Sequence, residues 1–273
     1  MKRIAAAAFT FVALPLFAGF RHSGRNLTIT TEDREPVTRC SSIVVLNGDE
    51  RVPVVEEDVA AVRGLRSLNV QAPQNGGVYV SGSDDASYSV KTCKAAWNGS
   101  TRDVTTTLRG NELSANIPDD VDAVVYFVVR APRNASLELE SHNGPLSVID
   151  FDGTLNAHTH NGPIELKNVS GTINADAHNG PIGFTGGSGT VKLEAQNGPI
   201  SVNLNGHSWP SGTLEAHTQN GPLSLKLPAG YRSGVVVESD GRGDTPRHLE
   251  LGHGPAVVTL SAINGPVSVR ERD

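Results

Sequence analysis

The chain has 273 residues, of which 37% are hydrophobic, 19% charged and 5% aromatic, a balance that excludes a disordered chain. Its 29 glycines and 16 prolines follow no Gly-X-Y period, so they exclude collagen and favour a turn-rich protein. The formal net charge of -6 excludes nucleic acid as the partner, because binding to a phosphate backbone requires a basic surface.

Residues 1–20 have the pattern of an export signal. Lys2 and Arg3 precede an uncharged, apolar stretch from Ile4 to Phe20. A membrane anchor is the alternative, since this stretch approaches the length that spans a bilayer and no pair of small residues marks a clear cleavage site. We therefore expect an exported protein that is periplasmic, cell-surface or secreted. It would contact a membrane only through residues 1–20, if these are not cleaved.

The chain has two cysteines, Cys40 and Cys93. In an exported protein two thiols form a disulfide more often than a metal or catalytic site, with two buried free thiols as the alternative. The expected Cys40–Cys93 disulfide would staple residues 21–60, a less regular N-terminal cap segment, onto a repetitive body at residues 61–273.

Several strands are expected before the regular repeats begin. Asn75-Gly76-Gly77-Val78 is an imperfect first copy of the repeat motif. Apolar alternation predicts further strands at Asp103–Leu108, Glu112–Ile117 and Val121–Arg130.

An internal repeat dominates the rest of the chain. Asn-Gly-Pro followed by an aliphatic residue occurs six times, with successive spacings of 18, 18, 18, 23 and 44 residues, at Asn143, Asn161, Asn179, Asn197, Asn220 and Asn264. A second motif, Gly-Thr plus an aliphatic residue, lies eight residues before the next asparagine, at Gly153, Gly171, Gly189 and Gly212. Each unit therefore contains two short strands and two turns.

The alternation within a unit predicts how the units associate. Ile164 and Leu166 alternate with Glu165 and Lys167, which is the period of a half-buried strand. One unit cannot bury its aliphatic face alone, but stacked units can. We therefore predict an all-β fold, a single-chain β-solenoid of the parallel β-helix type, with coils of 18–22 residues marked by Asn-Gly-Pro turns. Continued alternation places the turn asparagines on the inner side of each corner.

Two other β architectures are alternatives to the solenoid. A left-handed hexapeptide helix needs an aliphatic residue at every sixth position, but positions 164, 170 and 176 hold Ile, Ser and Asp. An antiparallel meander remains a rival because Asn-Gly is a strong hairpin signal. The proline after each Asn-Gly argues against the meander, since it would begin the returning strand without a hydrogen-bond donor.

The longer spacings predict two departures from the regular stack. Residues 206–211 contain an insertion that should bulge outward as a loop. The 44-residue spacing divides into two units of 22, with Gly234–Val237 as a strand and Arg242-Gly243-Asp244 at the following turn. This tripeptide also matches an integrin-recognition sequence, but a polar turn is the simpler interpretation of so short a motif.

These motifs resemble those of the bacterial putative-adhesin family of exported β-strand-repeat proteins. The resemblance rests on Leu68–Val70 leading into Asn75–Val78, on Val128–Pro132, and on the serial Asn-Gly turns from Asn143 to Asn264. It covers most of residues 61–273. It implies a β-solenoid with a role in adhesion or at the cell envelope, and it brings no catalytic residues.

The histidines are the main candidates for site chemistry. His142, His160 and His178 each precede a turn asparagine, and His158 and Asp176 belong to a second outward column. Stacked coils could bring these side chains to one transition metal. A solvated polar ladder copied with the repeat is the interpretation that we favour, so neither a metal nor a cofactor is predicted.

The sequence therefore predicts a non-enzymatic adhesion, binding or structural module at the bacterial envelope, whose partner is an unknown envelope polymer, glycan or protein. One alternative is a polysaccharide-active parallel β-helix enzyme, although the outward carboxylates Glu165, Asp176, Glu194 and Glu215 are scattered. Others are a metal-binding surface protein that uses the histidines and a self-assembling scaffold. The charged C-terminal residues 270–273 argue against the scaffold, because charges protect an edge strand.

Overall fold

The structure is a computed structural model that describes residues 27–31, 37–239 and 247–272, with the backbone alone for residues 60–63. The export signal expected at residues 1–20 and the tripeptide Arg242-Gly243-Asp244 lie outside the described residues. No helix within the described ranges is both long and apolar enough to cross a membrane.

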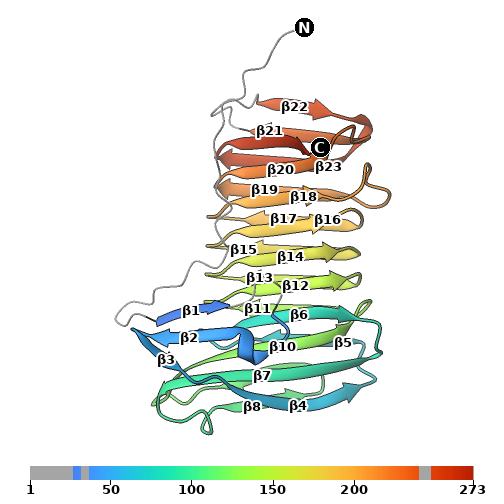
Figure 1. The fold of residues 1–273 in the computed structure, drawn as a ribbon. Helices are drawn as coiled ribbons and strands as arrows, with labels where there is room; N and C mark the ends of the chain where they lie inside the picture. Colours follow the sequence, from blue (N-terminus) through green and yellow to red (C-terminus); the bar gives the residue numbers. More distant parts are fainter. Residues whose placement is uncertain (1–26, 32–36, 240–246, 273) are drawn as a thin grey trace.

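The fold is all-β, as the sequence predicts. The described ranges hold one short 3-10 helix, η1 (Cys40–Ser42), and no α-helix, and their strands form three sheets. Figure 1 shows the two large sheets as layers of stacked strands, with the small sheet beside one end of the stack.

The first layer is a ten-stranded sheet. In spatial order its strands are β24 (Val267–Arg272), β20 (Leu223–Pro228), β18 (Ile200–Leu204), β16 (Ile182–Gly186), β14 (Ile164–Val169), β12 (Leu146–Phe151), β6 (Gly77–Ser83), β10 (Asp122–Pro132), β7 (Ser87–Asn98) and β4 (Val55–Arg63).

The second layer is an eleven-stranded sheet. In spatial order its strands are β22 (His248–Leu251), β21 (Ser233–Ser239), β23 (His253–Asn264), β19 (Leu214–Asn220), β17 (Thr190–Ala195), β15 (Thr172–Ala177), β13 (Thr154–Thr159), β11 (Ser136–Ser141), β5 (Ser67–Gln71), β9 (Glu112–Asn116) and β8 (Thr105–Arg109).

From β11 to β20 the chain alternates between the two sheets, and each strand pairs in parallel with its equivalent in the next repeat. Leu155 of β13 lies beside Ile173 of β15, and Ile164 of β14 lies beside Ile182 of β16. This register equals the 18-residue spacing of the motifs, so identical positions form columns along the stack. The parallel pairing excludes the antiparallel meander for this region.

The core lies between the two layers. Inward side chains of both sheets belong to one hydrophobic cluster, and the strand β13 shows strict alternation of exposed and buried positions. Leu155, Ile164 and Ile173 are 1% exposed or less. The small aliphatic side chains that a single repeat leaves uncovered are therefore buried by the repeats on either side.

The stack begins with the strands that precede the regular repeats. The imperfect copy at Asn75 leads into β6, which pairs in parallel with β12, while β5 pairs in parallel with β11. The three expected strands of this region are present as β8, β9 and β10. At this end β10 and β7 pair antiparallel, so the parallel stack changes here into an antiparallel region.

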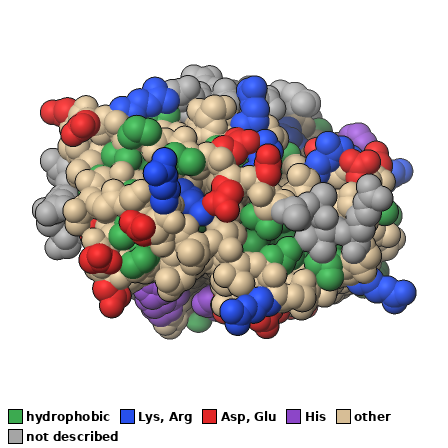
Figure 2. Space-filling view, turned by 90° about the horizontal axis from the view of Figure 1, so that it is seen from below, with side chains coloured by type: hydrophobic (Ala, Val, Ile, Leu, Met, Phe, Trp, Pro, Cys, Tyr) green, Lys and Arg blue, Asp and Glu red, His purple; other side chains and the backbone are tan. Residues whose placement is uncertain are grey.

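The edge strands at this end carry charge. β4 is an edge of the ten-stranded sheet, and it contains Glu56, Glu57 and Asp58. Lys91 and Lys94 on the neighbouring β7 pair with Glu56 and Glu57. Figure 2 views this end and shows side chains of both signs among exposed hydrophobic ones. Charges of this kind disfavour pairing with another strand.

The N-terminal segment is more regular than the sequence indicated. Strands β1 (Leu27–Thr31), β2 (Ile43–Asn47) and β3 (Glu50–Val52) form an antiparallel sheet. A second hydrophobic cluster lies between this sheet and the outer face of β6, β7 and β10.

The predicted disulfide is present, with the Cα atoms of Cys40 and Cys93 5.3 Å apart. The expected start of the repetitive body at residue 61 falls within β4.

The division of the 44-residue spacing into two consecutive units was wrong. β23 stacks directly on β19, and β24 stacks directly on β20, so the Asn264 repeat follows the Asn220 repeat without a coil between them. The intervening β21 lies beyond β23 and pairs antiparallel with β22. The amide of Asn264 donates to Asn220 (3.0 Å), and this corner contact favours the direct stacking.

The insertion at residues 206–211 does not simply bulge outward. Trp209 turns back and is 5% exposed, with its ring centroid 6.4 Å from that of Phe184. Its Nε1 donates to the carbonyl of Gly189 (3.0 Å). Burial of an indole with its N–H satisfied is favourable, so Trp209 joins the core while Gly206, His207, Pro210 and Ser211 stay exposed.

Candidate functional site

The outer surface of the eleven-stranded sheet is a face of polar columns, which we call the polar face. Its strands β13, β15, β17, β19 and β23 present every second side chain outward. Parallel register aligns equivalent positions into one column, formed by His158, Asp176, Glu194, His217 and Ser261. We call this the acid-histidine column.

Neighbouring side chains on the polar face form specific pairs. His158 Nδ1 lies 2.7 Å from Asp176 Oδ1, and His217 Nδ1 lies 2.7 Å from Ser261 Oγ. Glu194 accepts from Lys192 on its own strand (3.0 Å). This hydrogen bond and the charge of Glu194 raise the Lys192 pKa above 10.5, so its ammonium group stays charged at neutral pH.

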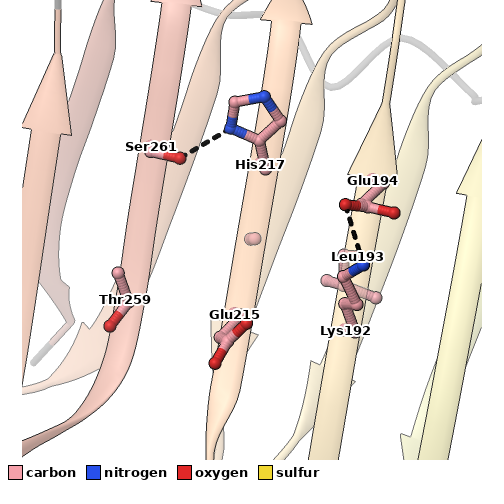
Figure 3. A pocket seen from close by; sticks show the side chains of 8 residues that line it. Lys192, Leu193, Glu194, Glu215, His217, Thr259 and Ser261 are labelled. Carbon is pink, nitrogen blue, oxygen red and sulfur yellow. Dashed lines mark hydrogen bonds and ion pairs between the residues drawn. The ribbon is translucent and has the colours of Figure 1, made fainter.

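A shallow hollow of about 160 Å³ lies where the polar face passes from β17 to β23. Figure 3 shows His217 and Ser261 joined by a hydrogen bond on one side of the hollow and Lys192 joined to Glu194 on another. Short side chains on β23, among them Thr259, leave the space open. The hollow offers hydrogen-bond donors and acceptors together, which suits the binding of a polar partner.

The carboxylates that the sequence singled out do not form one site. Glu165 is on β14 and faces outward from the ten-stranded sheet, whereas Asp176, Glu194 and Glu215 are on the opposite, polar face. Burial raises the pKa of Glu165, and its Oε2 has no hydrogen-bond partner in the described structure. The two-carboxylate arrangement that glycoside hydrolysis uses therefore cannot include Glu165 with the other three.

The turn asparagines form a continuous hydrogen-bonded ladder at one corner of the stack. Each side-chain amide nitrogen donates to the amide oxygen of the preceding repeat, with distances of 2.8 to 3.1 Å, along Asn75, Asn143, Asn161, Asn179, Asn197, Asn220 and Asn264. The expected inner placement was wrong, because Asn179, Asn197 and Asn220 are exposed. The chain bends after the last buried residue of each strand, so strand alternation does not extend to the asparagine.

Buried hydroxyls occupy the inner side of this corner. Ser141 and Thr218 donate to the carbonyls of Gly76 (2.7 Å) and Gly198 (2.9 Å) in the preceding repeats, and Thr159 donates to Gly144. Each hydroxyl residue precedes its turn asparagine by two positions, a spacing that could have identified them.

The histidines before the turns stack face to face. The ring centroids of His142 and His160 are 4.9 Å apart, those of His160 and His178 are 4.6 Å apart, and the rings are within 7° of parallel. Ring nitrogens lie in the planes of these rings, so they do not converge on one ion. No group of three or more His, Cys, Asp or Glu in the described ranges is arranged to hold a metal.

This stacking changes the protonation of the central ring. Partial desolvation lowers the pKa of His160 below 6.5, and the neighbouring His178, His142 and His158 lower it further. The structure separates the five histidine and aspartate candidates into a stack of three rings and the His158–Asp176 pair.

No protein-family model matches the chain, and no curated protein matches it significantly. Solved structures with a similar fold include a putative adhesin of Bacteroides fragilis, 11% identical, with a TM-score of 0.36 over 81% of this chain and 97% of that one. A putative adhesin of Parabacteroides merdae is 11% identical, with a TM-score of 0.30 over 80% and 96% of the two chains.

A putative lipid binding protein of Parabacteroides distasonis is 10% identical, with a TM-score of 0.28 over 80% of this chain and 97% of that one. Two of these structures are thus named putative adhesins and one a putative lipid binding protein. Sequence identities and TM-scores this low do not show a function for this chain.

Proposed function

We propose that the protein is an exported β-solenoid that acts as a rigid, non-enzymatic binding or structural module at the bacterial cell envelope. Its partner is an envelope polymer, a glycan or a protein. In this proposal the two layers of parallel strands are the two sides of one solenoid, and the Asn-Gly-Pro segments are its turns. Residues 1–20 act as the export signal, 21–60 as an N-terminal cap and 61–273 as the adhesin-like domain.

The observation that carries this proposal is the polar face. Parallel register repeats outward side chains at each strand, about 4.8 Å apart along the stack. The acid-histidine column crosses five strands in this way. The buried core on the inner side holds these strands in place, so the face is preorganised for a partner and loses little entropy on binding.

The disulfide supports export. Cys40 and Cys93 are bonded, and disulfides persist in oxidising compartments such as the periplasm and the cell exterior. Together with the basic and apolar pattern of residues 1–20, this favours a periplasmic, cell-surface or secreted location.

A sedimentation assay with isolated cell envelopes tests the proposal. The purified protein should bind saturably to the envelope fraction and leave its polysaccharides uncleaved. A polar-face variant, Lys192→Ala with Glu194→Gln and His217→Gln, should bind about tenfold more weakly, because it removes both paired groups that border the hollow. The matched control, Asn203→Ala with Ser224→Ala and Lys226→Ala, alters the outer face of the ten-stranded sheet and should bind normally.

Two outcomes would contradict the proposal. Equal binding by the polar-face variant and the wild type would exclude the polar face as the binding surface. Release of reducing sugar ends from the envelope fraction would show that the protein is an enzyme.

A further inference from the structure

A polar groove lies at the opposite edge of the stack from the asparagine ladder. It crosses the four successive turns that join β12 to β13, β14 to β15, β16 to β17 and β18 to β19. Its volume is about 320 Å³, and its polar lining comes from Asp152, Asn168, Ser170, Ser188 and Asn205. We call it the turn groove.

The groove exists because one turn lacks bulky side chains. Gly186 and Gly187 occupy the positions that Asn168 and Val169 hold one repeat earlier. A Cβ atom at Gly186 would lie 2.6 Å from Phe184 Cζ, so the ring of Phe184 occupies the space beneath this turn. The glycine turn therefore forms a low floor between higher neighbouring turns.

The wall on the β18 side is held rigidly. The backbone N–H of Asn205 donates to the Gly186 carbonyl (2.8 Å), and Trp209 is anchored in the core beyond it. The N–H of Trp209 donates to Ser233 Oγ (2.8 Å), and the carbonyl of His207 accepts from Arg232 (2.9 Å). These contacts preorganise the loop, so a ligand need not order it.

The wall on the β14 side is fixed by side-chain hydrogen bonds. Asn168 Nδ2 donates to Asp150 Oδ1 (2.6 Å), and Ser170 Oγ donates to Asp152 Oδ1 (2.6 Å). Asn168 has a φ of 54°, a left-handed conformation that asparagine tolerates better than most residues. Its amide oxygen has no partner among the described residues and can accept from a ligand.

The lining determines the class of ligand. Amides and hydroxyls supply donors and acceptors together, as sugar hydroxyl groups require. A calcium site needs more carboxylate oxygens than the single lining carboxylate, Asp152, and that carboxylate also disfavours an anion. Four successive turns are separated by three spacings of about 4.8 Å, so the groove extends over about 14 Å, enough for a short stretch of glycan chain.

We propose that the turn groove binds a neutral, hydroxyl-rich glycan segment. This inference rests on the proposed function as a binding module, and it adds a ligand class and a second surface. The polar face and the turn groove share no lining residue, so variants can test each one separately.

Isothermal titration calorimetry of the purified protein with neutral hexasaccharides of glucose, xylose, mannose and N-acetylglucosamine provides the test. At least one sugar should bind saturably. Ser188→Tyr, which fills the groove, and Asn168→Gly, which removes the amide but permits the same backbone conformation, should each weaken that binding at least about tenfold. Thr190→Tyr places the same ring two residues away on an outward position of β17 and should bind normally.

Circular dichroism verifies that each variant is folded. Binding to none of the hexasaccharides, or equal binding by Ser188→Tyr and wild type, would overturn the glycan inference. Sugar binding that EDTA abolishes would identify a cation site instead and would also overturn it. If the polar-face variant binds envelopes more weakly than the wild type while the groove variants bind them normally, the proposed function stands without this inference.

Discussion

Stacked imidazoles bring three titratable side chains into direct contact at the surface. The rings of His142, His160 and His178 stack face to face, and desolvation together with the neighbouring histidines disfavours a proton on the central ring of His160. In the next repeat Gln196 occupies the equivalent position, so the repeat accepts an uncharged polar side chain there. Histidine at these stacked positions should therefore lower the free energy of unfolding at acidic pH.

The pKa of His160 predicts the direction of this pH dependence. A folded-state pKa below 6.5 means that the unfolded chain binds the proton more readily, so the free energy of unfolding should fall as the pH drops below about 6.5. His160→Gln should reduce that fall. Urea unfolding of wild type and variant between pH 8 and pH 5 measures it, and parallel pH profiles would contradict the prediction.

Trp209 anchors the insertion to the core. Trp209→Ala should lower the free energy of unfolding by about 3 to 5 kcal/mol, because it leaves a cavity beside Phe184. Trp209→Phe retains an aromatic ring but loses the hydrogen bond to Gly189, so we expect a loss nearer the lower end of that range. Urea unfolding followed by circular dichroism compares them. A loss below about 0.5 kcal/mol for Trp209→Ala would show that the loop is independent of the core.

At the scale of one turn, close backbone approach and the amide ladder both hold neighbouring repeats together. A Cβ atom on Gly180 would overlap the carbonyl oxygen of Gly162, and the same relation recurs between Gly198 and Gly180. The ladder contributes hydrogen bonds that are exposed to water, and such bonds add little net stability. Glycine is therefore the stricter requirement at this corner.

Paired substitutions at adjacent positions separate these two effects. Gly180→Ala should destabilise by about 3 kcal/mol or more, because backbone must move to admit the methyl group. Asn179→Ala breaks two ladder bonds and should cost about 1 to 2 kcal/mol. Thermal and urea unfolding of both variants test the order, and a larger loss for Asn179→Ala would show that the amides dominate.

The sequence predicts those elements whose neighbours repeat the same pattern. Strands β13 to β18 follow from the 18-residue spacing, since identical units bury identical faces against one another. The sequence does not predict the placement of β21, because the choice between a position beside β19 and one beyond β23 depends on contacts between distant residues. The inward turn of Trp209 likewise depends on contacts with Phe184 and the Gly189 carbonyl, which belong to another repeat.

The sequence likewise predicts some features of the candidate sites and not others. Columns on the polar face could be predicted, because parallel register transfers sequence spacing directly into space. The hollow and the turn groove could not be predicted, since both arise from local differences between repeats, such as the short Thr259 on β23 and the glycines at 186 and 187. The corner asparagines were assigned to the wrong side, because the alternation of a strand ends where its backbone bends.

At the scale of the whole molecule, two hydrophobic cores meet at the ten-stranded sheet. The larger cluster lies between the two layers, and the smaller one lies under the three-stranded sheet around Tyr79 and Tyr126. Burial raises the pKa of both tyrosines, which therefore stay neutral throughout the physiological pH range. The small sheet covers the side of the stack near one end, and its attachment depends on the smaller cluster together with the disulfide.

Removal of the disulfide should therefore loosen the small sheet before the stack. Cys40 and Cys93 are 53 residues apart, and closing a loop of this length stabilises by about 4 kcal/mol in the chain-entropy model. Cys40→Ser with Cys93→Ser should expose the segment around β2 and β3 to protease, while β11 to β20 stay protected by their own core. Limited proteolysis with mass spectrometry locates the first cuts, and dithiothreitol treatment of the wild type should reproduce them. First cuts within residues 136–228, or loss of all protection in one step, would show that the two cores unfold as one unit and that the disulfide stabilises the entire stack.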